Sequence, residues 1–98
     1  MIRIIDGRGT GKTSRLMLLA KEQNGIIVCH DPDIYQKKAW NYGLTGIDFV
    51  SYSGYLRDLQ ERKHGYADRP IFIDELDGLL KYLHSNIAGY SLSQDSNI

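Results

Sequence analysis

The sequence is poor in the residues and runs that mark several large classes of protein. Of its 98 residues only Cys29 is a cysteine, which excludes an internal disulfide and any metal site built on a cysteine pair. No apolar run approaches the roughly 18 residues that a membrane-spanning helix needs, so we expect no membrane partner. The 12 basic and 12 acidic residues cancel, and a net charge of zero leaves no overall field that attracts nucleic acid.

The remaining composition is typical of one globular domain. Hydrophobic residues make up 42% of the chain and charged residues 24%, in mixed order. We assign residues 1–92 to a single minimal domain and residues 93–98 to a polar C-terminal tail. Met1 runs directly into an apolar segment, so we expect no signal peptide and a cytoplasmic location.

The most informative stretch is a glycine-rich segment between a short apolar run and a helical pattern. Its core is G-x-G-K-T, ending in Gly11, Lys12 and Thr13. Such loops cradle phosphates with backbone N–H groups, because small residues allow close approach and the following helix adds partial positive charge. Lys12 is then expected to reach the β- and γ-phosphates, and the Thr13 hydroxyl to bind Mg²⁺. The expected nucleotide-binding residues are Gly7, Arg8, Gly9, Thr10, Gly11, Lys12, Thr13 and Ser14.

One position departs from the full phosphate-loop pattern. G-x-x-x-x-G-K-S/T requires a glycine six residues before the lysine, and this chain has Asp6 there. A carboxylate near phosphates is repulsive unless it points away. The alternative interpretation is a glycine-rich turn that connects a strand to a helix and holds no nucleotide.

A second stretch, Pro70 to Glu75, has three apolar residues followed by two carboxylates. It is typical of a buried strand whose carboxyl end presents Asp74 and Glu75, as in a Walker B segment. There the aspartate holds Mg²⁺ and an adjacent glutamate acts as general base on water. The alternative is that both acids only begin a helix, since acidic residues favour a first turn.

The whole chain alternates apolar runs with helical patterns, which predicts an α/β fold. We expect a three-layer core like that of P-loop proteins, with a parallel sheet of four to five strands flanked by helices. The expected strands cover residues 2–5, 26–29, 47–50 and 71–73, with a further strand at 87–92. The expected helices cover residues 12–23, 32–42 and 76–83, and a further helix capped by Ser51 or Ser53 runs through Glu61 to a ragged end.

Together, residues 6–13 and 70–75 resemble P-loop NTPases of the class with a glutamate after the Walker B aspartate, which includes RecA-like, AAA+ and helicase ATPases. Within this class the chain is similar to small single-domain ATPase-like proteins encoded by phages and prophages of Gram-positive bacteria. The resemblance implies that the strand at 87–92 lies between the phosphate-loop strand and the Walker B strand. It also implies catalytic roles for Lys12 and Glu75, Mg²⁺ ligation by Thr13 and Asp74, and ATP with Mg²⁺ as cofactors.

Two functions from different classes therefore remain open. The first is a protein that binds ATP or another NTP and hydrolyses it slowly or only with a partner. That partner is a second copy of the chain or another protein. The second is a phage-type binding or inhibitory module in which nucleotide is structural or absent. The chain is short and offers no arginine finger at a motif position; Arg57, Arg62 and Arg69 are the candidates.

A local basic cluster leaves nucleic acid as a partner that is possible in principle but not indicated. Its basic residues, with three tyrosines interleaved, are Arg57, Arg62, Lys63, His64 and Arg69, and the tyrosines are Tyr52, Tyr55 and Tyr66. Basic residues mixed with aromatic rings can hold single-stranded nucleic acid. Nearby acidic residues lower the net charge of this cluster, so we favour the interpretation that it is a solvent-exposed helix face and not a nucleic-acid site.

Overall fold

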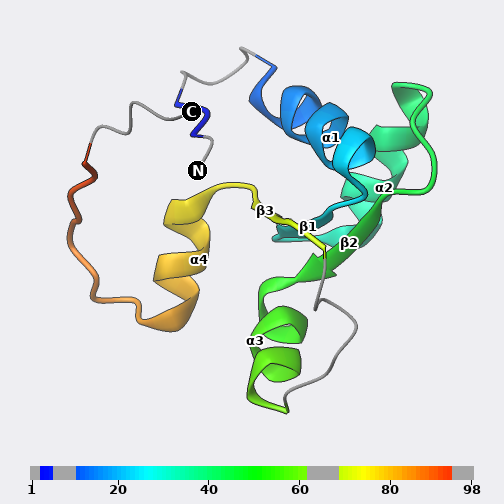
Figure 1. Ribbon diagram of the computed structural model, residues 1–98. Coiled ribbons are helices and arrows are strands. Elements are labelled where there is room, and N and C mark those ends of the chain that lie inside the picture. The colour runs from blue at the N-terminus through cyan, green and yellow to red at the C-terminus, as the bar shows by residue number, and fades with distance from the viewer. Residues whose placement is uncertain (1–2, 6–10, 62–68, 94–98) are drawn as a thin grey trace.

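The computed structural model is an α/β fold built on a small parallel sheet (Figure 1). It describes residues 3–5, 11–61 and 69–93. The described elements are α1 Lys12–Gln23, β1 Ile26–Cys29, α2 Pro32–Asn41, β2 Asp48–Ser51, α3 Tyr52–Gln60, β3 Ile71–Ile73 and α4 Leu76–Leu83. In this described part the strand order is β2-β1-β3, and both pairings of β1 are parallel.

Local sequence signals explain where the helices begin. The Asp31 side chain caps α2 by accepting hydrogen bonds from the backbone N–H groups of Asp33 and Ile34, and Pro32 occupies the first turn. Ser51 caps α3, since its hydroxyl accepts from the N–H of Gly54 at 3.0 Å. The predicted helices therefore form within one or two residues of their expected bounds.

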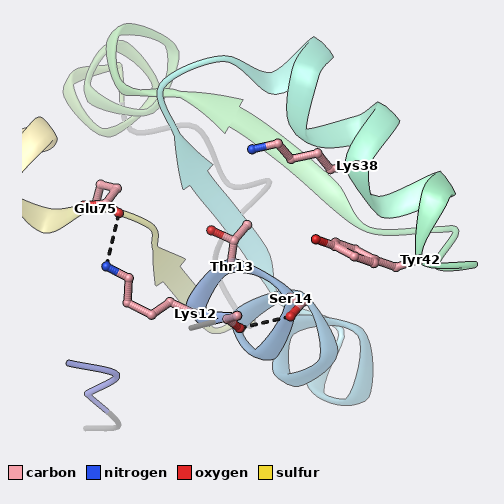
Figure 2. Close-up of a pocket in the computed structure, with 7 residues that line it drawn as sticks. Lys12, Thr13, Ser14, Lys38, Tyr42 and Glu75 are labelled. Atoms are coloured by element: carbon pink, nitrogen blue, oxygen red, sulfur yellow. Dashed lines mark hydrogen bonds and ion pairs between the residues drawn. The ribbon is translucent and has the colours of Figure 1, made fainter. Parts of the chain in front are cut away.

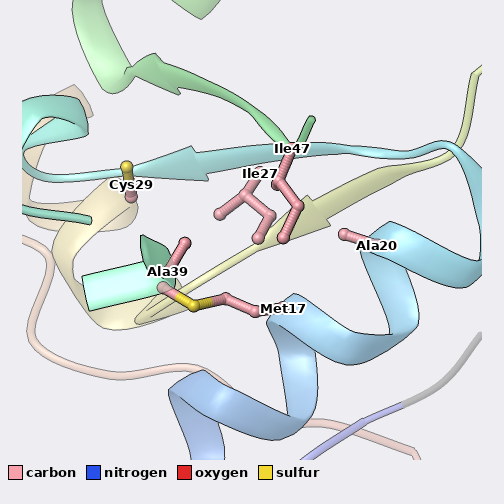
Figure 3. Close-up of a cluster of buried hydrophobic side chains, with 6 residues drawn as sticks. All are labelled: Met17, Ala20, Ile27, Cys29, Ala39 and Ile47. Carbon is pink, nitrogen blue, oxygen red and sulfur yellow. The ribbon is translucent and has the colours of Figure 1, made fainter. Parts of the chain in front are cut away.

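Helices cover both faces of the central strand. All four residues of β1 are buried, and alternate side chains point to opposite sides of the sheet. On one face Ile27 and Cys29 pack with residues of α1 and α2 (Figure 3): Met17, Ala20, Ala39 and the nearby Ile47. On the other face Val28 packs with Tyr52 of α3 and Leu79 of α4. The predicted layering of helices around a parallel sheet is thus present on this smaller scale.

Cys29 is a core residue. Its side chain is fully buried between β1 and the helices above it. Burial, with a smaller contribution from the charge of Asp74, raises the pKa of the Cys29 thiol to about 12. At neutral pH the thiol therefore stays protonated and packs as a small apolar group.

Arg69 ties together the amino ends of the strands. Its guanidinium donates to the backbone carbonyls of Asn24 and Gly25 and pairs with Asp48 at 2.7 Å. These contacts fix the start of β3 against the turn before β1 and the start of β2. Arg69, one of the three candidates for an arginine finger, thus has a structural role at the edge of the sheet opposite the motif residues.

The predicted outer strands are not formed in the described residues. Residues 3–5 have no strand conformation, the rest of the predicted strand 2–5 lies outside the described part, and residues 87–92 form no strand. Their long-range contacts include side-chain bonds from Arg3 to the Ser93 carbonyl and from Tyr90 to Asp77. A strand needs a ladder of backbone bonds and a buried face, and both Tyr90 and Leu92 are about half exposed. The expected sheet of four to five strands is accordingly not confirmed.

We predict that Gly25→Ala destabilises the fold because the space beside Gly25 is filled. An added Cβ would lie 2.6 Å from the Phe72 ring and 3.0 Å from the Pro70 carbonyl oxygen, which also accepts the Ile26 N–H. Overpacking of this kind costs about 1–3 kcal/mol. Chemical denaturation should show the loss in Gly25→Ala and none in Gly89→Ala, where nothing lies within 4 Å. Equal stability of the two variants would contradict this packing.

Candidate functional site

The two motif segments meet where β3 ends and α1 begins. The Thr13 hydroxyl donates to Asp74 Oδ2 at 3.3 Å, although 61 positions separate the two residues in the sequence. Beside them, Lys12 Nζ lies 3.6 Å from Glu75 Oε1 (Figure 2). All four residues expected to carry the chemistry of a nucleotide site are therefore in direct contact, in two cross-segment pairs.

The carboxyl end of β3 brings the acidic pair to this place. The Asp74 N–H donates to the Val28 carbonyl at 3.0 Å, so the parallel ladder continues one residue past β3. Asp74 is only 6% exposed, whereas the side chain of Glu75 is 55% exposed. The two neighbouring carboxylates thus have different environments, one held within the fold and one at its surface.

The start of α1 supplies an electropositive wall. Gly11 precedes the helix with φ of 81°, a left-handed conformation that favours glycine. Gly11 has no side chain to cap the helix, so the first N–H groups of α1 are available to an external acceptor. The Ser14 hydroxyl donates back to the Gly11 carbonyl at 3.0 Å, which fixes this turn.

A pocket of about 380 Å³ opens in front of this helix end. Residues 11–14 line one side and Glu75 lines another, while Lys38 of α2 and Tyr42, just after α2, line the rest (Figure 2). The lining is mainly polar and carries two lysines and one carboxylate. An anionic ligand with hydrogen-bond acceptors matches such a lining better than an apolar ligand does.

Tyr35 holds the buried carboxylate of Asp74 in place. Its hydroxyl donates to Asp74 Oδ2 at 2.6 Å, the same oxygen that Thr13 contacts. Burial, and then the hydrogen bond to Asp74, raise the pKa of the Tyr35 hydroxyl above its ordinary value. The phenol therefore keeps its proton at neutral pH and remains a donor to the carboxylate.

Tyr52 fixes the backbone of Asp74 and Glu75, the residues that carry the two carboxylates. From α3 its buried hydroxyl lies 3.1 Å from the Asp74 carbonyl oxygen and 3.2 Å from that of Glu75, so it can donate to either. Burial raises the pKa of Tyr52, so this hydroxyl also stays protonated. Gly78 allows the contact, because a Cβ there would lie 2.8 Å from the Tyr52 hydroxyl oxygen.

Glu75 has an unusual backbone conformation. Its φ of 58° and ψ of 73° place a non-glycine residue in the left-handed region directly before α4. Such a conformation costs on the order of 1–3 kcal/mol and is found mainly where surrounding structure enforces it, often at functional sites. Here the enforcing contacts are the Tyr52 hydroxyl and the continuation of the ladder at Asp74.

Several expected residues fall outside this description or away from the site. Asp6, Gly7, Arg8, Gly9 and Thr10 lie outside the described residues, as do Arg62, Lys63, His64 and Tyr66 of the basic cluster. Arg57 is exposed on α3 beside Asp58, with 3.8 Å between charged atoms. Of the finger candidates in the described part, neither Arg57 nor Arg69 lines the pocket.

Three residues on α2 or directly after it shape the site and were missed in the sequence. They are Tyr35, Lys38 and, at the C-cap of the helix, Tyr42, and their i, i+3 and i+7 spacing puts them on one side of α2. That face is directed at the pocket and at Asp74. The spacing was a usable signal, but a mixed face of tyrosine and lysine is equally typical of a solvated helix surface.

We predict that Tyr35→Phe lowers the stability of the protein by about 1–3 kcal/mol, because it leaves a buried carboxylate with one fewer donor. Urea denaturation at neutral pH measures the loss. Tyr42→Phe is the matched control, since the Tyr42 side chain is exposed. An unchanged unfolding midpoint in Tyr35→Phe would show that the 2.6 Å hydrogen bond from the Tyr35 hydroxyl to Asp74 Oδ2 does not contribute to stability.

Comparison of the chain with protein-family models, with curated proteins and with solved structures found no significant match. The site is therefore interpreted from its own residues. Within the described residues, no helix combines the length and apolar character needed to cross a bilayer.

Proposed function

We propose that this protein binds ATP, or another nucleoside triphosphate, together with Mg²⁺, and hydrolyses it slowly or only with a partner. The observation that carries the proposal is the meeting of two distant motif segments at one pocket, through Thr13 with Asp74 and Lys12 with Glu75. A turn that only connects a strand to a helix would not require these pairings. The resemblance of both segments to P-loop NTPases that have a glutamate after the Walker B aspartate supports the same function.

Thr13 and Asp74 are the residues that would hold Mg²⁺. Their oxygens lie 3.3 Å apart, and both are of the hard type that Mg²⁺ prefers. Mg²⁺ is commonly bound through one or two carboxylates while phosphate oxygens and water complete its shell. When bound, the ion neutralises charge on the phosphates.

The phosphate chain fits against the amino end of α1. Backbone N–H groups at Gly11 and the first helical residues would donate hydrogen bonds to its oxygens. Lys12 would move from Glu75 to the phosphates, since a phosphate is a stronger partner than a half-exposed carboxylate. We assign Gly11, Lys12, Thr13 and Ser14 to this role.

Glu75 is then the general base. Release from Lys12 leaves its carboxylate free at the surface of the pocket, where it can accept a proton from a water molecule attacking the terminal phosphate. Its enforced backbone conformation fixes the direction from which it does so. Asp74, buried and bound by Tyr35, keeps its role as the metal carboxylate.

A thermal-shift experiment tests this proposal. ATP with Mg²⁺ should raise the unfolding temperature in a concentration-dependent way, because a ligand that binds only the folded state stabilises it by mass action. AMP, which lacks the β- and γ-phosphates, should have little effect. Equal shifts with ATP and AMP, or none with either, would argue against a polyphosphate site.

A second candidate function is a binding module that acts on a protein partner. It is favoured by large apolar side chains that are each more than half exposed, among them Ile5, Leu18, Leu83 and Leu92. Exposed apolar side chains of this kind are typical of partner-binding surfaces. A partner that binds equally well with and without ATP would favour this function over the first.

A further inference from the structure

One wall of the pocket belongs to neither motif segment and has no function in the proposed nucleotide site. It is formed by Lys38 of α2 and by Tyr42, just after α2 (Figure 2). Of these two, only Lys38 carries a charge. It comes from an element that neither motif segment includes, so it is an independent addition to the site.

The position of the Lys38 ammonium group is set by the same tyrosine that orients the metal carboxylate. Lys38 Nζ lies 5.2 Å from the centre of the Tyr35 ring. An ammonium group over an aromatic face is attracted by the ring's negative face. The hydroxyl of that ring donates to Asp74 at 2.6 Å. Lys38 is thereby held on the side of the pocket where Asp74 and Thr13 would bind Mg²⁺.

Lys38 differs from Lys12 in having no carboxylate partner among the described residues. Lys12 is paired with Glu75, while no carboxylate of the described ranges lies within ion-pair distance of Lys38. An unneutralised cation at the wall of a polar pocket favours an anion in that pocket. A cation beside the residues that would hold Mg²⁺ would lie close to the phosphates whose charge that ion would offset.

We propose that Lys38 binds the terminal phosphate of the bound nucleoside triphosphate and makes the site selective for triphosphates over diphosphates. This inference rests on the function proposed above. Lys12 approaches the phosphates from α1 and Lys38 from α2, so the terminal phosphate lies between two cations supplied by one chain. A diphosphate ends before it reaches Lys38 and gains nothing from it.

The test is the affinity for ATP and for ADP, each with Mg²⁺, measured by calorimetry on the full chain. Lys38→Ala should weaken ATP binding about tenfold, the effect of losing one charge-assisted hydrogen bond, and should change ADP binding less than twofold. Lys38→Arg keeps the charge and should retain most of the preference for ATP. Lys37→Ala is the matched control, since Lys37 is an exposed neighbour on α2 that does not line the pocket.

The possible failures are distinguishable. If wild type binds ATP and Lys38→Ala keeps the same ratio of ATP to ADP affinity, the role of Lys38 is wrong while the nucleotide site stands. If Lys38→Ala weakens ATP and ADP equally, Lys38 acts on the fold or on the inner phosphates, and selectivity is excluded. If wild type binds neither nucleotide, both the proposed function and this inference are overturned. Circular dichroism of each variant confirms that the fold is retained.

Discussion

Replacing Lys12 with alanine is expected to weaken ATP binding by more than tenfold. The substitution removes a charge-assisted contact to the phosphates, and a tenfold change corresponds to about 1.4 kcal/mol. The fold itself should lose little stability, because the Lys12–Glu75 pair is partly exposed and pairs of this kind contribute about 0–1 kcal/mol. Calorimetric titration with ATP and Mg²⁺ measures the first effect, and urea denaturation measures the second.

The control for this prediction is Lys81→Ala, which removes an equal charge from the exposed side of α4. Its ATP affinity should equal that of wild type. If Lys12→Ala binds ATP as tightly as wild type does, the glycine-rich segment is only a turn and the pairing with Glu75 is an ordinary surface contact.

Replacing Glu75 with glutamine is expected to remove hydrolysis while ATP stays bound. The amide keeps the shape of the side chain but cannot accept a proton from water, and general-base catalysis contributes a factor of about 10²–10⁴. Loss of the carboxylate also frees Lys12 from its partner, so ATP binding should be unchanged or tighter. Phosphate release and ATP affinity, measured on the same preparation, separate the two effects.

Wild-type activity itself is expected to be low in a dilute sample. An arginine finger contributes a factor of about 10³–10⁵ in related phosphoryl-transfer sites. Neither Arg57 nor Arg69 reaches the pocket in the described part of the chain, and a lysine lacks the forked geometry of a guanidinium. Activity should therefore rise with protein concentration or with an added partner. Unchanged activity in Glu75→Gln would mean that Glu75 only begins α4.

The inner elements of the fold were predictable because local signals and burial agree there. The continuous apolar run of β1 indicates a strand buried on both faces, and the structure places it at the centre of the sheet. Asp31 and Ser51 stand at helix starts where their side chains cap backbone N–H groups. The two motif segments also meet as expected, since parallel strands and their following helices place such ends at one edge.

The remaining features depend on contacts that no local pattern encodes. Tyr35 reaches Asp74 across 39 positions, and the packing of α2 against the sheet brings them together. The left-handed conformation of Glu75 follows from Tyr52 and not from its own preference. The outer strands at 2–5 and 87–92 were predicted from apolar residues alone. In the described residues of these segments the apolar side chains are partly or largely exposed. The free energy from burying apolar surface, which drives strand pairing, is therefore missing.

The most direct test of nucleotide binding is a calorimetric titration of the full chain with ATP, in Mg²⁺ and again in EDTA. Binding through Lys12 and the start of α1, with Mg²⁺ held by Thr13 and Asp74, predicts saturable binding of one ATP per chain that weakens markedly in EDTA. The absence of binding in both buffers would contradict the account. Binding of equal affinity with and without the metal would contradict the role given to Thr13 and Asp74.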